Sequence, residues 1–235
     1  MQSTSMCKRN MSPLQSKYQG IIFDLDGVIC HTDKFHYLAW KTMTDKHGIY
    51  FDERINDRLR GVSRMESLDV ILERYEGPGL SDRERLLFAE EKNEVYKSLL
   101  MQMDENDVPE DVVSTLNALR EMGVKLAIGS SSKNAQLILG RIGLGSFFDA
   151  VSDGNSISHS KPHPEVFLLA AKLVGLPPAG CLVVEDARAG IEAAVRGGFD
   201  SVGIGDAAGD ERATYKIFSF CELVDIVYAN KEDTH

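Results

Sequence analysis

Residues 18–28 read YQGIIFDLDGV, and this stretch decides the fold. Its short apolar run, Ile21 to Phe23, suits a parallel strand that is buried on both faces. Asp24 and Asp26 follow the run, and Gly27 lets the chain turn sharply after them. We therefore expect residues 18–25 to form a buried strand with acidic side chains at its carboxyl end.

The hydrophobic period changes downstream of this strand. From about residue 34 to residue 103 apolar residues recur at helical spacing. Ser63 with Glu66 and Ser81 with Glu84 have the spacing of capping boxes that open further helices. The stretch is interpreted as an inserted helical cap domain.

After residue 103, predicted strands and helices alternate. Strands are expected at residues 124–129, 147–151, 181–184 and 201–204. Helices are expected at residues 112–122, 133–142, 164–174 and 191–195, and residues 223–227 close the domain. Such alternation is typical of an α/β fold with a doubly wound, mostly parallel sheet, which is a Rossmann-like core. The predicted organisation is a tail (1–17), a catalytic core (18–33 and 104–235) and a helical cap (34–103).

The composition limits the possible functions. The chain has 235 residues and a formal net charge of −10, enough for one large domain or two unequal ones. Nucleic acid is not an expected partner, because phosphate contacts need clustered Lys and Arg and no such run occurs. No apolar run approaches the roughly 18 residues of a membrane span, so a membrane is not expected either.

The cysteines favour a reducing compartment. Cys7, Cys30, Cys181 and Cys221 lie far apart, with neither zinc-site spacing nor the density of a disulfide scaffold. No apolar segment follows the polar residues 1–17, so no signal core is expected there. The interpretation is a cytoplasmic protein, and a monomer because no apolar seam is evident outside the predicted cores.

Polar residues stand where the predicted strands end. Ligands of a doubly wound sheet bind at the carboxyl ends of its strands, so these residues should meet at one edge. The set consists of Asp24, Asp26, Ser130, Glu185 and Asp186, with Lys161 before a helix in the same half. A convergence of this kind is the main indication of an active site.

These residue types suit chemistry on a phosphate ester. A carboxylate such as Asp24 can attack phosphorus once cations neutralise the repulsion between the two anions. Lys161 and a Mg²⁺ ion can supply that charge, and Mg²⁺ prefers oxygen ligands such as Asp24 and Asp186. Ser130 precedes a helix whose N–H groups can hold phosphate oxygens. Asp26 can then act as general acid and base.

The motifs resemble the haloacid dehalogenase superfamily, whose members are mostly phosphatases and phosphomutases. The resemblance is carried by residues 23–28 (FDLDGV), then Ser130, Lys161 and Glu185 with Asp186, in that order. Within the superfamily the chain is similar to the beta-phosphoglucomutase subfamily from about residue 20 to the last strands. The segments that carry this similarity are Thr32, His36 and Trp40, then 59–64 (LRGVSR), Lys92 with Asn93, and 130–134 (SSSKN).

The resemblance implies a phosphoryl-transfer cycle on β-D-glucose 1-phosphate. Phosphorylated Asp24 donates its group to the sugar 6-hydroxyl, and the resulting glucose 1,6-bisphosphate returns its 1-phosphate to Asp24. Asp26 is implied as the acid and base, and Arg64 as the residue that holds the distal phosphate. Mg²⁺ is implied at Asp24, Asp26, Glu185 and Asp186. The implied substrate and phosphate contacts are Thr32, His36, Trp40, Arg64, Lys92, Ser130, Ser131 and Lys161.

One departure from the subfamily lies at the expected hinge. His31 stands before Thr32, where the mutases commonly have Asp. This difference affects the expected timing of cap closure.

Several of these residues also have structural interpretations. The two aspartates after the first strand could be turn formers, Glu185 could support a ligand rather than bind the metal, and Trp40 could belong to the cap core. His36 could be a packing residue, and Arg64 and Lys92 could be solvated helix residues. His159 and His163 are interpreted as loop residues rather than metal ligands.

Three classes of function stay open at this point. They are a mutase, a phosphatase of a small sugar or nucleotide phosphate, and a non-catalytic phosphosugar-binding protein. An intact pair of Asp24 and Asp26 disfavours the third, because a binding protein has little use for a nucleophile with an acid. Between the first two, the cap decides by excluding water and holding a second phosphate.

Overall fold

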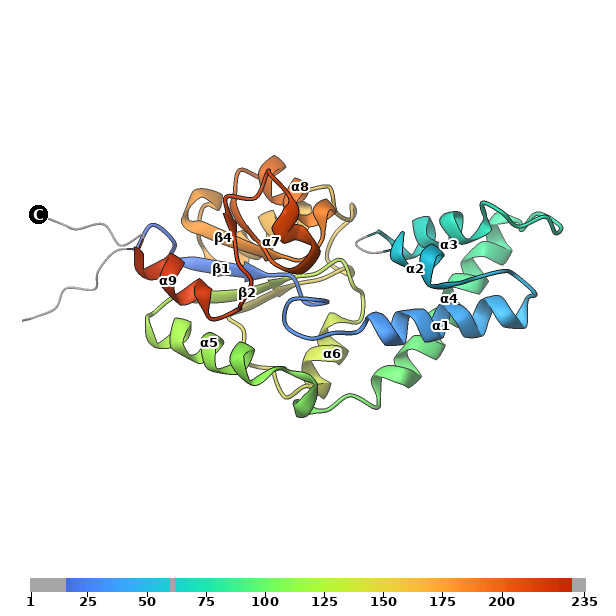
Figure 1. Cartoon of the computed structure of the whole chain (residues 1–235), viewed down its shortest axis with the longest axis horizontal. Helices are drawn as coiled ribbons and strands as arrows, with labels where there is room; N and C mark the ends of the chain where they lie inside the picture. The colour runs from blue at the N-terminus through green and yellow to red at the C-terminus, as the bar shows by residue number, and fades with distance from the viewer. Residues whose placement is uncertain (1–15, 60–61, 230–235) are drawn as a thin grey trace, which may run out of the picture.

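Six parallel strands form one sheet in the order β3-β2-β1-β4-β5-β6 in the computed structural model, which describes residues 16–59 and 62–229 (Figure 1). The strands are β1 (Gly20–Phe23), β2 (Lys125–Gly129), β3 (Ala150–Ser152), β4 (Cys181–Glu185), β5 (Asp200–Gly203) and β6 (Tyr215–Lys216). The strand after residue 18 is central, because β1 pairs with β2 on one side and with β4 on the other. The doubly wound parallel sheet predicted from the sequence is confirmed.

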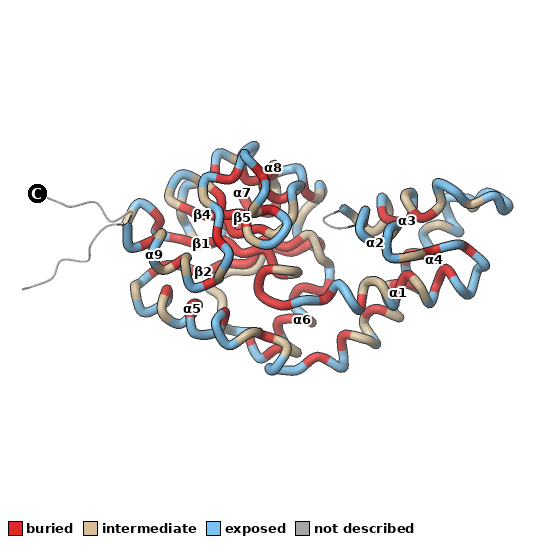
Figure 2. Tube along the Cα trace, viewed as in Figure 1, coloured by how far each residue is buried: buried red, intermediate tan, exposed pale blue. Residues whose placement is uncertain are grey.

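Helices cover both faces of the sheet. Side chains alternate along each strand, so Ile21 and Phe23 face one apolar cluster while Ile22 faces the other. The helices on the first face are α5 (Glu110–Glu121), α6 (Ala135–Arg141) and α9 (Glu222–Ala229). Those on the second face are α7 (Glu165–Val174) and α8 (Arg188–Arg196). Figure 2 shows the resulting buried layer through the middle of the core.

A separate lobe of helices extends from one end of the sheet domain (Figure 1). It consists of α1 (Asp33–Lys46), α2 (Glu53–Asp57), α3 (Arg64–Leu72) and α4 (Asp82–Leu100). Both predicted capping boxes are confirmed, at the starts of α3 and α4. The lobe has its own apolar cluster, which includes Trp40, Leu68 and Phe88. The lobe therefore packs around an apolar cluster of its own, while Phe35 of α1 and Leu100 of α4 belong to the cluster of the sheet domain.

Some predicted element bounds differ from the observed ones. The strand expected at residues 147–151 is β3, three residues long and beginning at Ala150. Phe147 and Phe148 precede it in a turn, where Phe147 N–H donates to the Leu144 carbonyl at 3.1 Å. Their aromatic character suggested a strand, but they are half-buried and Phe148 packs on Phe23 from outside the sheet. The two-residue strand β6 was not predicted.

Some sequence predictions fall on residues outside the described ranges. Residues 1–15 of the predicted tail lie there, and so do Arg60 and Gly61 of the cap segment 59–64. Within the described ranges, no helix is both long and apolar enough to cross a membrane.

Candidate active site

The predicted strand-end residues meet at one edge of the sheet. In the pairing register, Phe23 of β1 lies opposite Ile128 of β2 and Val184 of β4. The polar residues therefore follow this level closely on three adjacent strands. Asp24 and Glu185 are one residue beyond Phe23 and Val184, and Ser130 is two residues beyond Ile128. Parallel pairing of neighbouring strands is the physical reason that residues so far apart in sequence converge.

Lys161 links two of these strand ends. Its ammonium group donates to Asp24 Oδ1, and to Glu185 Oε1 at 2.5 Å. The three side chains are nearly inaccessible to solvent. Glu185 also accepts the Ala187 N–H through its other oxygen at 2.9 Å. The Lys161 ammonium thus compensates the charge of Glu185, which favours the interpretation that Glu185 positions Lys161 rather than binding a metal directly.

Glycines allow the acidic loops to approach closely. Gly27 has a φ of +87°, and a Cβ on it would lie 2.1 Å from Asp186 Oδ2. A Cβ on Gly190 would lie 1.8 Å from Glu185 Oε1. The Asp186 carboxylate therefore packs directly against the loop that carries Asp24 and Asp26.

Asp26 is held by a hydroxyl from the hinge. Thr32 Oγ1 donates to Asp26 Oδ1, and Thr32 is fully buried. Burial raises the pKa of Asp26, and the Thr32 hydrogen bond partly opposes that rise. A carboxyl with a raised pKa holds a proton more readily than an ordinary aspartate, which suits a general acid and base. Thr32 itself contacts Asp26 and does not line the cavity described below.

The carboxyl groups of the site raise one another's pKa values. Burial, and next the charge of Glu185, raise the pKa of Asp186 to about 7. Burial also raises the pKa of Asp24 well above its usual range, although Lys161 opposes this. The core site thus holds more negative than positive charge, and a further cation would relieve it.

The donor set fits a hard divalent cation. Asp24, Asp26 and Asp186 offer oxygen atoms, the ligands that Mg²⁺ prefers. In the described part of the chain these three carboxylates are spread apart. Three of their oxygen atoms, taken one from each side chain, do not all lie within 4.8 Å of one another. Mg²⁺ usually takes only one or two carboxylates and fills the remaining positions with water and substrate, so Asp24 and Asp186 are sufficient.

The cap contributes a second buried lysine. Lys92 Nζ lies 3.0 Å from His36 Nδ1, and it lies 4.8 and 4.7 Å from the ring centroids of Trp40 and Tyr96. Burial, with the charge of Arg64, lowers the pKa of Lys92 to about 7. Burial, then the charges of Lys92 and Arg64, lower the pKa of His36 well below its usual range. Trp40 belongs to the cap core and also lines the cavity.

A hydrogen-bonded bridge joins the cap to the core. Asn93 Oδ1 accepts from Arg64 Nη2 at 2.8 Å and from Asn134 Nδ2 at 2.9 Å. Asn93 lies on α4 of the cap, whereas Asn134 immediately precedes α6 of the core. Of these three residues, the sequence analysis gave a role to Arg64 only. It noted the segments that contain the two asparagines, Lys92 with Asn93 and residues 130–134, but gave neither asparagine a role.

These residues surround one cavity of about 830 Å³ between cap and core. From the core, Asp24, Asp26, Ser130, Ser131, Lys161, Glu185 and Asp186 line it. From the cap, His36, Trp40, Arg64, Lys92 and Asn93 line it. Ser131 Oγ also accepts the Lys161 N–H at 3.4 Å, and His31 is exposed at the hinge. Of the predicted side-chain set, Thr32 is absent from the lining.

The fold and the site define a class of phosphoryl-transfer enzymes. A family model described as haloacid dehalogenase-like hydrolase matches residues 18–198. The chain belongs to this family.

Three individual relatives are similar to most of this chain. Beta-phosphoglucomutase of Bacillus subtilis (strain 168) is 36% identical over 80% of this chain and 83% of its own length. The crystal structure of a beta-phosphoglucomutase from Clostridium difficile has a TM-score of 0.80 and 38% identity, covering 88% of this chain and 93% of that one. Fructose-1-phosphate phosphatase YqaB of Escherichia coli (strain K12) is 34% identical over 81% and 98% of the two chains. The relatives thus include both a mutase and a phosphatase of sugar phosphates.

Proposed function

We propose that this protein is a phosphomutase that interconverts β-D-glucose 1-phosphate and glucose 6-phosphate. The single observation that supports the proposal is the cavity, which is lined by Asp24 and Asp26 from the core and by Arg64 and Lys92 from the cap. One end can perform phosphoryl transfer and the other can hold a second phosphate. A mutase needs both ends at once, because its intermediate is a bisphosphate.

The core residues have complementary tasks in this reaction. Phosphorylated Asp24 transfers its phosphoryl group to the sugar 6-hydroxyl, while Asp26 takes the hydroxyl proton. The bisphosphate then turns over, and the Asp24 carboxylate attacks its 1-phosphate while Asp26 returns the proton to the leaving sugar oxygen. Lys161 and Ser130 bind the transferring phosphate. Asp24, Asp186 and the Asp26 carbonyl would hold Mg²⁺, which when bound supplies positive charge beside that phosphate.

The cap residues select the substrate in this proposal. Among the described residues Arg64 forms no ion pair. Its hydrogen-bond partner there is the neutral side-chain amide of Asn93. Burial lowers the pKa of the Arg64 guanidinium, so an anion that neutralises it is favoured in the cavity. A sugar phosphate can supply that anion and accept two parallel hydrogen bonds from the guanidinium. Lys92 of α4 lines the cavity with Arg64, and His36, one turn before Trp40 on α1, lines it where the sugar would bind.

The deciding experiment measures two products separately. The protein is incubated with β-glucose 1-phosphate, Mg²⁺ and a trace of β-glucose 1,6-bisphosphate, and glucose 6-phosphate and free phosphate are followed in parallel assays. We expect glucose 6-phosphate to form well in excess of free phosphate. Release of phosphate without glucose 6-phosphate would contradict the mutase proposal.

A phosphatase is the second candidate, and the relationship to a fructose-1-phosphate phosphatase favours it specifically. It needs the same Asp24, Asp26, Lys161 and Asp186 and differs in letting water attack the aspartyl phosphate. The closure of the cap over the cavity decides between them, because a closed cap excludes water while the bisphosphate turns over. Free phosphate formed from several small sugar phosphates at similar rates would favour this candidate.

A further inference from the structure

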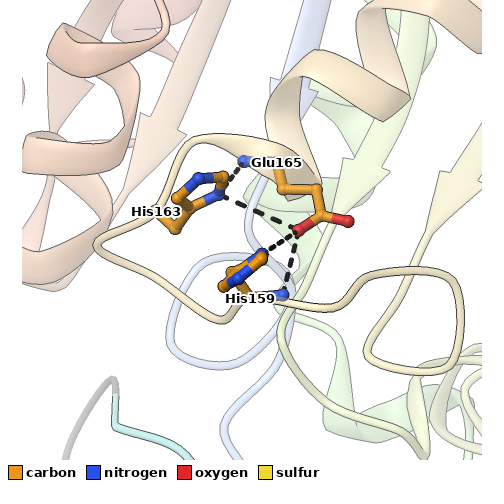
Figure 3. Close-up of side chains that lie close together, drawn as sticks. All are labelled: His159, His163 and Glu165. Carbon is orange, nitrogen blue, oxygen red and sulfur yellow. Dashed lines mark hydrogen bonds and ion pairs between the residues drawn. The ribbon is translucent and has the colours of Figure 1, made fainter.

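A group of side chains of the types that bind metals lies beside the cavity, outside the catalytic set. His159, His163 and Glu165 each offer one ligand atom, and these atoms all lie within 4.8 Å of one another (Figure 3). His159 Nδ1 is 3.0 Å from Glu165 Oε2, and His163 Nδ1 is 3.8 Å from the same oxygen. The sequence interpretation treated both histidines as loop residues and did not include Glu165.

The carboxylate of this group is already oriented. Glu165 Oε1 accepts the Ser158 N–H at 2.9 Å, and Oε2 accepts the His159 N–H at 2.9 Å. These backbone bonds aim Oε2 at both imidazole rings, whose centroids are 4.6 Å apart. Ligands that are held by outer hydrogen bonds in this way lose little freedom when a metal binds.

The hydrogen bonds of the two histidines indicate which ring nitrogens carry a hydrogen. The Glu165 backbone N–H donates to His163 Nδ1 at 3.3 Å, so that nitrogen carries no hydrogen, and a metal ion bound there would replace this hydrogen bond. His159 Nδ1 faces a carboxylate, which can only accept, so it carries a hydrogen in this contact. A metal ion would take the place of that hydrogen, which in the neutral ring moves through solvent to Nε2.

The spacing and the ligand types identify the class of ion. A tetrahedral Zn²⁺ ion about 2.0 to 2.1 Å from its ligands separates them by roughly 3.3 Å, and the two distances to Oε2 are 3.0 and 3.8 Å. Two imidazoles and one carboxylate suit zinc and its neighbours among the transition metals, whereas Mg²⁺ prefers an all-oxygen set.

We propose that His159, His163 and Glu165 form a second metal site, which binds a divalent transition-metal ion such as Zn²⁺ through two imidazoles and one carboxylate. The fourth position is open to water or to a ligand in the cavity, because both histidines line it. Lys161 lies between the two histidines in the sequence and contacts Asp24. An ion at this site joins the two ends of the loop that positions Lys161.

Glu165 can also act without a metal, and the experiment has to distinguish these two roles. Glu165 is the first residue of α7, where a carboxylate is stabilised by the helix dipole, and it can pair with His159 without any metal. In that role His163 supports the start of α7, because its Nδ1 accepts the Glu165 N–H. The side chains of His159 and His163 are 66% and 50% exposed, so both can be replaced with little effect on the fold.

The test is a calorimetric titration of the full-length protein with ZnCl₂ in excess Mg²⁺, which occupies the carboxylate site. We expect one Zn²⁺ per chain at this site and a zinc-dependent rise in Tm. In the double variant His159→Asn/His163→Asn the affinity should fall about 10²-fold or more, since loss of a supporting residue alone costs about 10- to 100-fold. Glu165→Gln should also lose binding, because a neutral amide replaces the anionic ligand and its one oxygen can take the place of only one of the two carboxylate oxygens that accept the Ser158 and His159 N–H groups.

Two control variants separate this site from others. His47→Asn removes an exposed histidine of the cap and should leave the zinc isotherm unchanged. Asp186→Asn alters the catalytic carboxylates and should also keep the second metal site. Equal zinc affinity and stoichiometry in the wild type and the double variant would overturn the proposal, and so would the absence of zinc binding by the wild type.

Discussion

The core and the cap each bury one lysine at the cavity, and the two lysines have opposite environments. Lys161 is 5% exposed and Lys92 is 2% exposed. Burial lowers the pKa of both, but the charges of Asp24 and Glu185 raise the pKa of Lys161 above its usual range. Lys92 lies near Arg64 and two aromatic rings, and its pKa falls to about 7.

This difference separates the tasks of the two regions. The core cation is compensated in the resting protein, because two carboxylates hold it directly. Within the described residues, the contacts of Lys92 are an imidazole and aromatic faces rather than a carboxylate. We infer that the core is arranged around the charges of the reaction, whereas the cap has a place for an anion that the substrate brings.

The largest expected effect tests whether the chemistry belongs to the core alone. Asp26→Asn removes the proposed acid and base, and turnover should fall by roughly 10² to 10⁴-fold. Because this step is common to transfer and hydrolysis, mutase activity and hydrolysis of a small phosphate ester should fall together. The measurement is kcat for both reactions, with circular dichroism to confirm the fold. An unchanged rate would remove Asp26 from the mechanism.

The second effect is on stability, and it compares the two lysines directly. Lys161→Met leaves Asp24 and Glu185 without their cation, and losing one partner of a buried ion pair costs about 3 to 5 kcal/mol. Lys92→Met removes a buried amine that has no carboxylate partner there, so the free energy of unfolding should be unchanged or should increase. Urea denaturation of both variants at pH 8 without ligand measures the contrast. Equal losses would mean that the two environments do not differ as described.

A third effect asks whether the cap selects rather than catalyses. Arg64→Ala removes a charged hydrogen-bond donor, worth about 1.5 to 3 kcal/mol, so mutase kcat/KM should fall about 10- to 100-fold. Hydrolysis of a small phosphate ester should change much less, because such an ester has no second phosphate to hold. Arg58→Ala is the matched control, since Arg58 is an exposed cap residue paired with Glu73. Equal losses in the two reactions of Arg64→Ala would contradict the distal-phosphate role.

The same division explains how much the sequence could predict. In the core, Asp24, Ser130 and Asp186 stand just after apolar runs, and parallel strands bring such positions to one edge. The fold and the convergence of these residues follow from that rule. The strand bounds were less accurate near Phe147, because an aromatic pair that packs from a turn has the same composition as a strand.

The cap residues could not be placed by any comparable rule. Arg64 and Lys92 occur in charged helical stretches, where the default expectation is a solvated face. Whether a helix residue faces a cavity depends on how two separate lobes pack, and that packing is set by contacts far away in sequence. The bridge from Asn93 to Asn134 is such a contact. Its two asparagines carry no chemical signature of their own.

The smallest effect measures the protonation of Lys92 itself. The pKa of Lys92 is about 7 in the folded chain, whereas its usual value, taken for the unfolded chain, is 10.5. Between these two pH values the unfolded chain therefore binds more protons than the folded chain. The contribution of Lys92 to stability therefore rises as pH increases from about 7 toward 10. At pH 8 most of the Lys92 side chains are neutral, and a bound phosphate dianion should restore the charged form. Binding of glucose 6-phosphate should then take up close to one proton per chain.

Calorimetry in two buffers of different ionisation enthalpy counts these protons, in an Asp24→Asn background that prevents turnover. Adding Lys92→Met should abolish the uptake at pH 8. Lys97→Met on the same helix should preserve it, because Lys97 is 43% exposed. Lowering the pH to 6 should reduce the uptake from Lys92, since it is then already charged in the free protein. A binding enthalpy that does not depend on the buffer at pH 8 would show that Lys92 keeps its charge without a ligand, and the two lysines would then differ only in their partners.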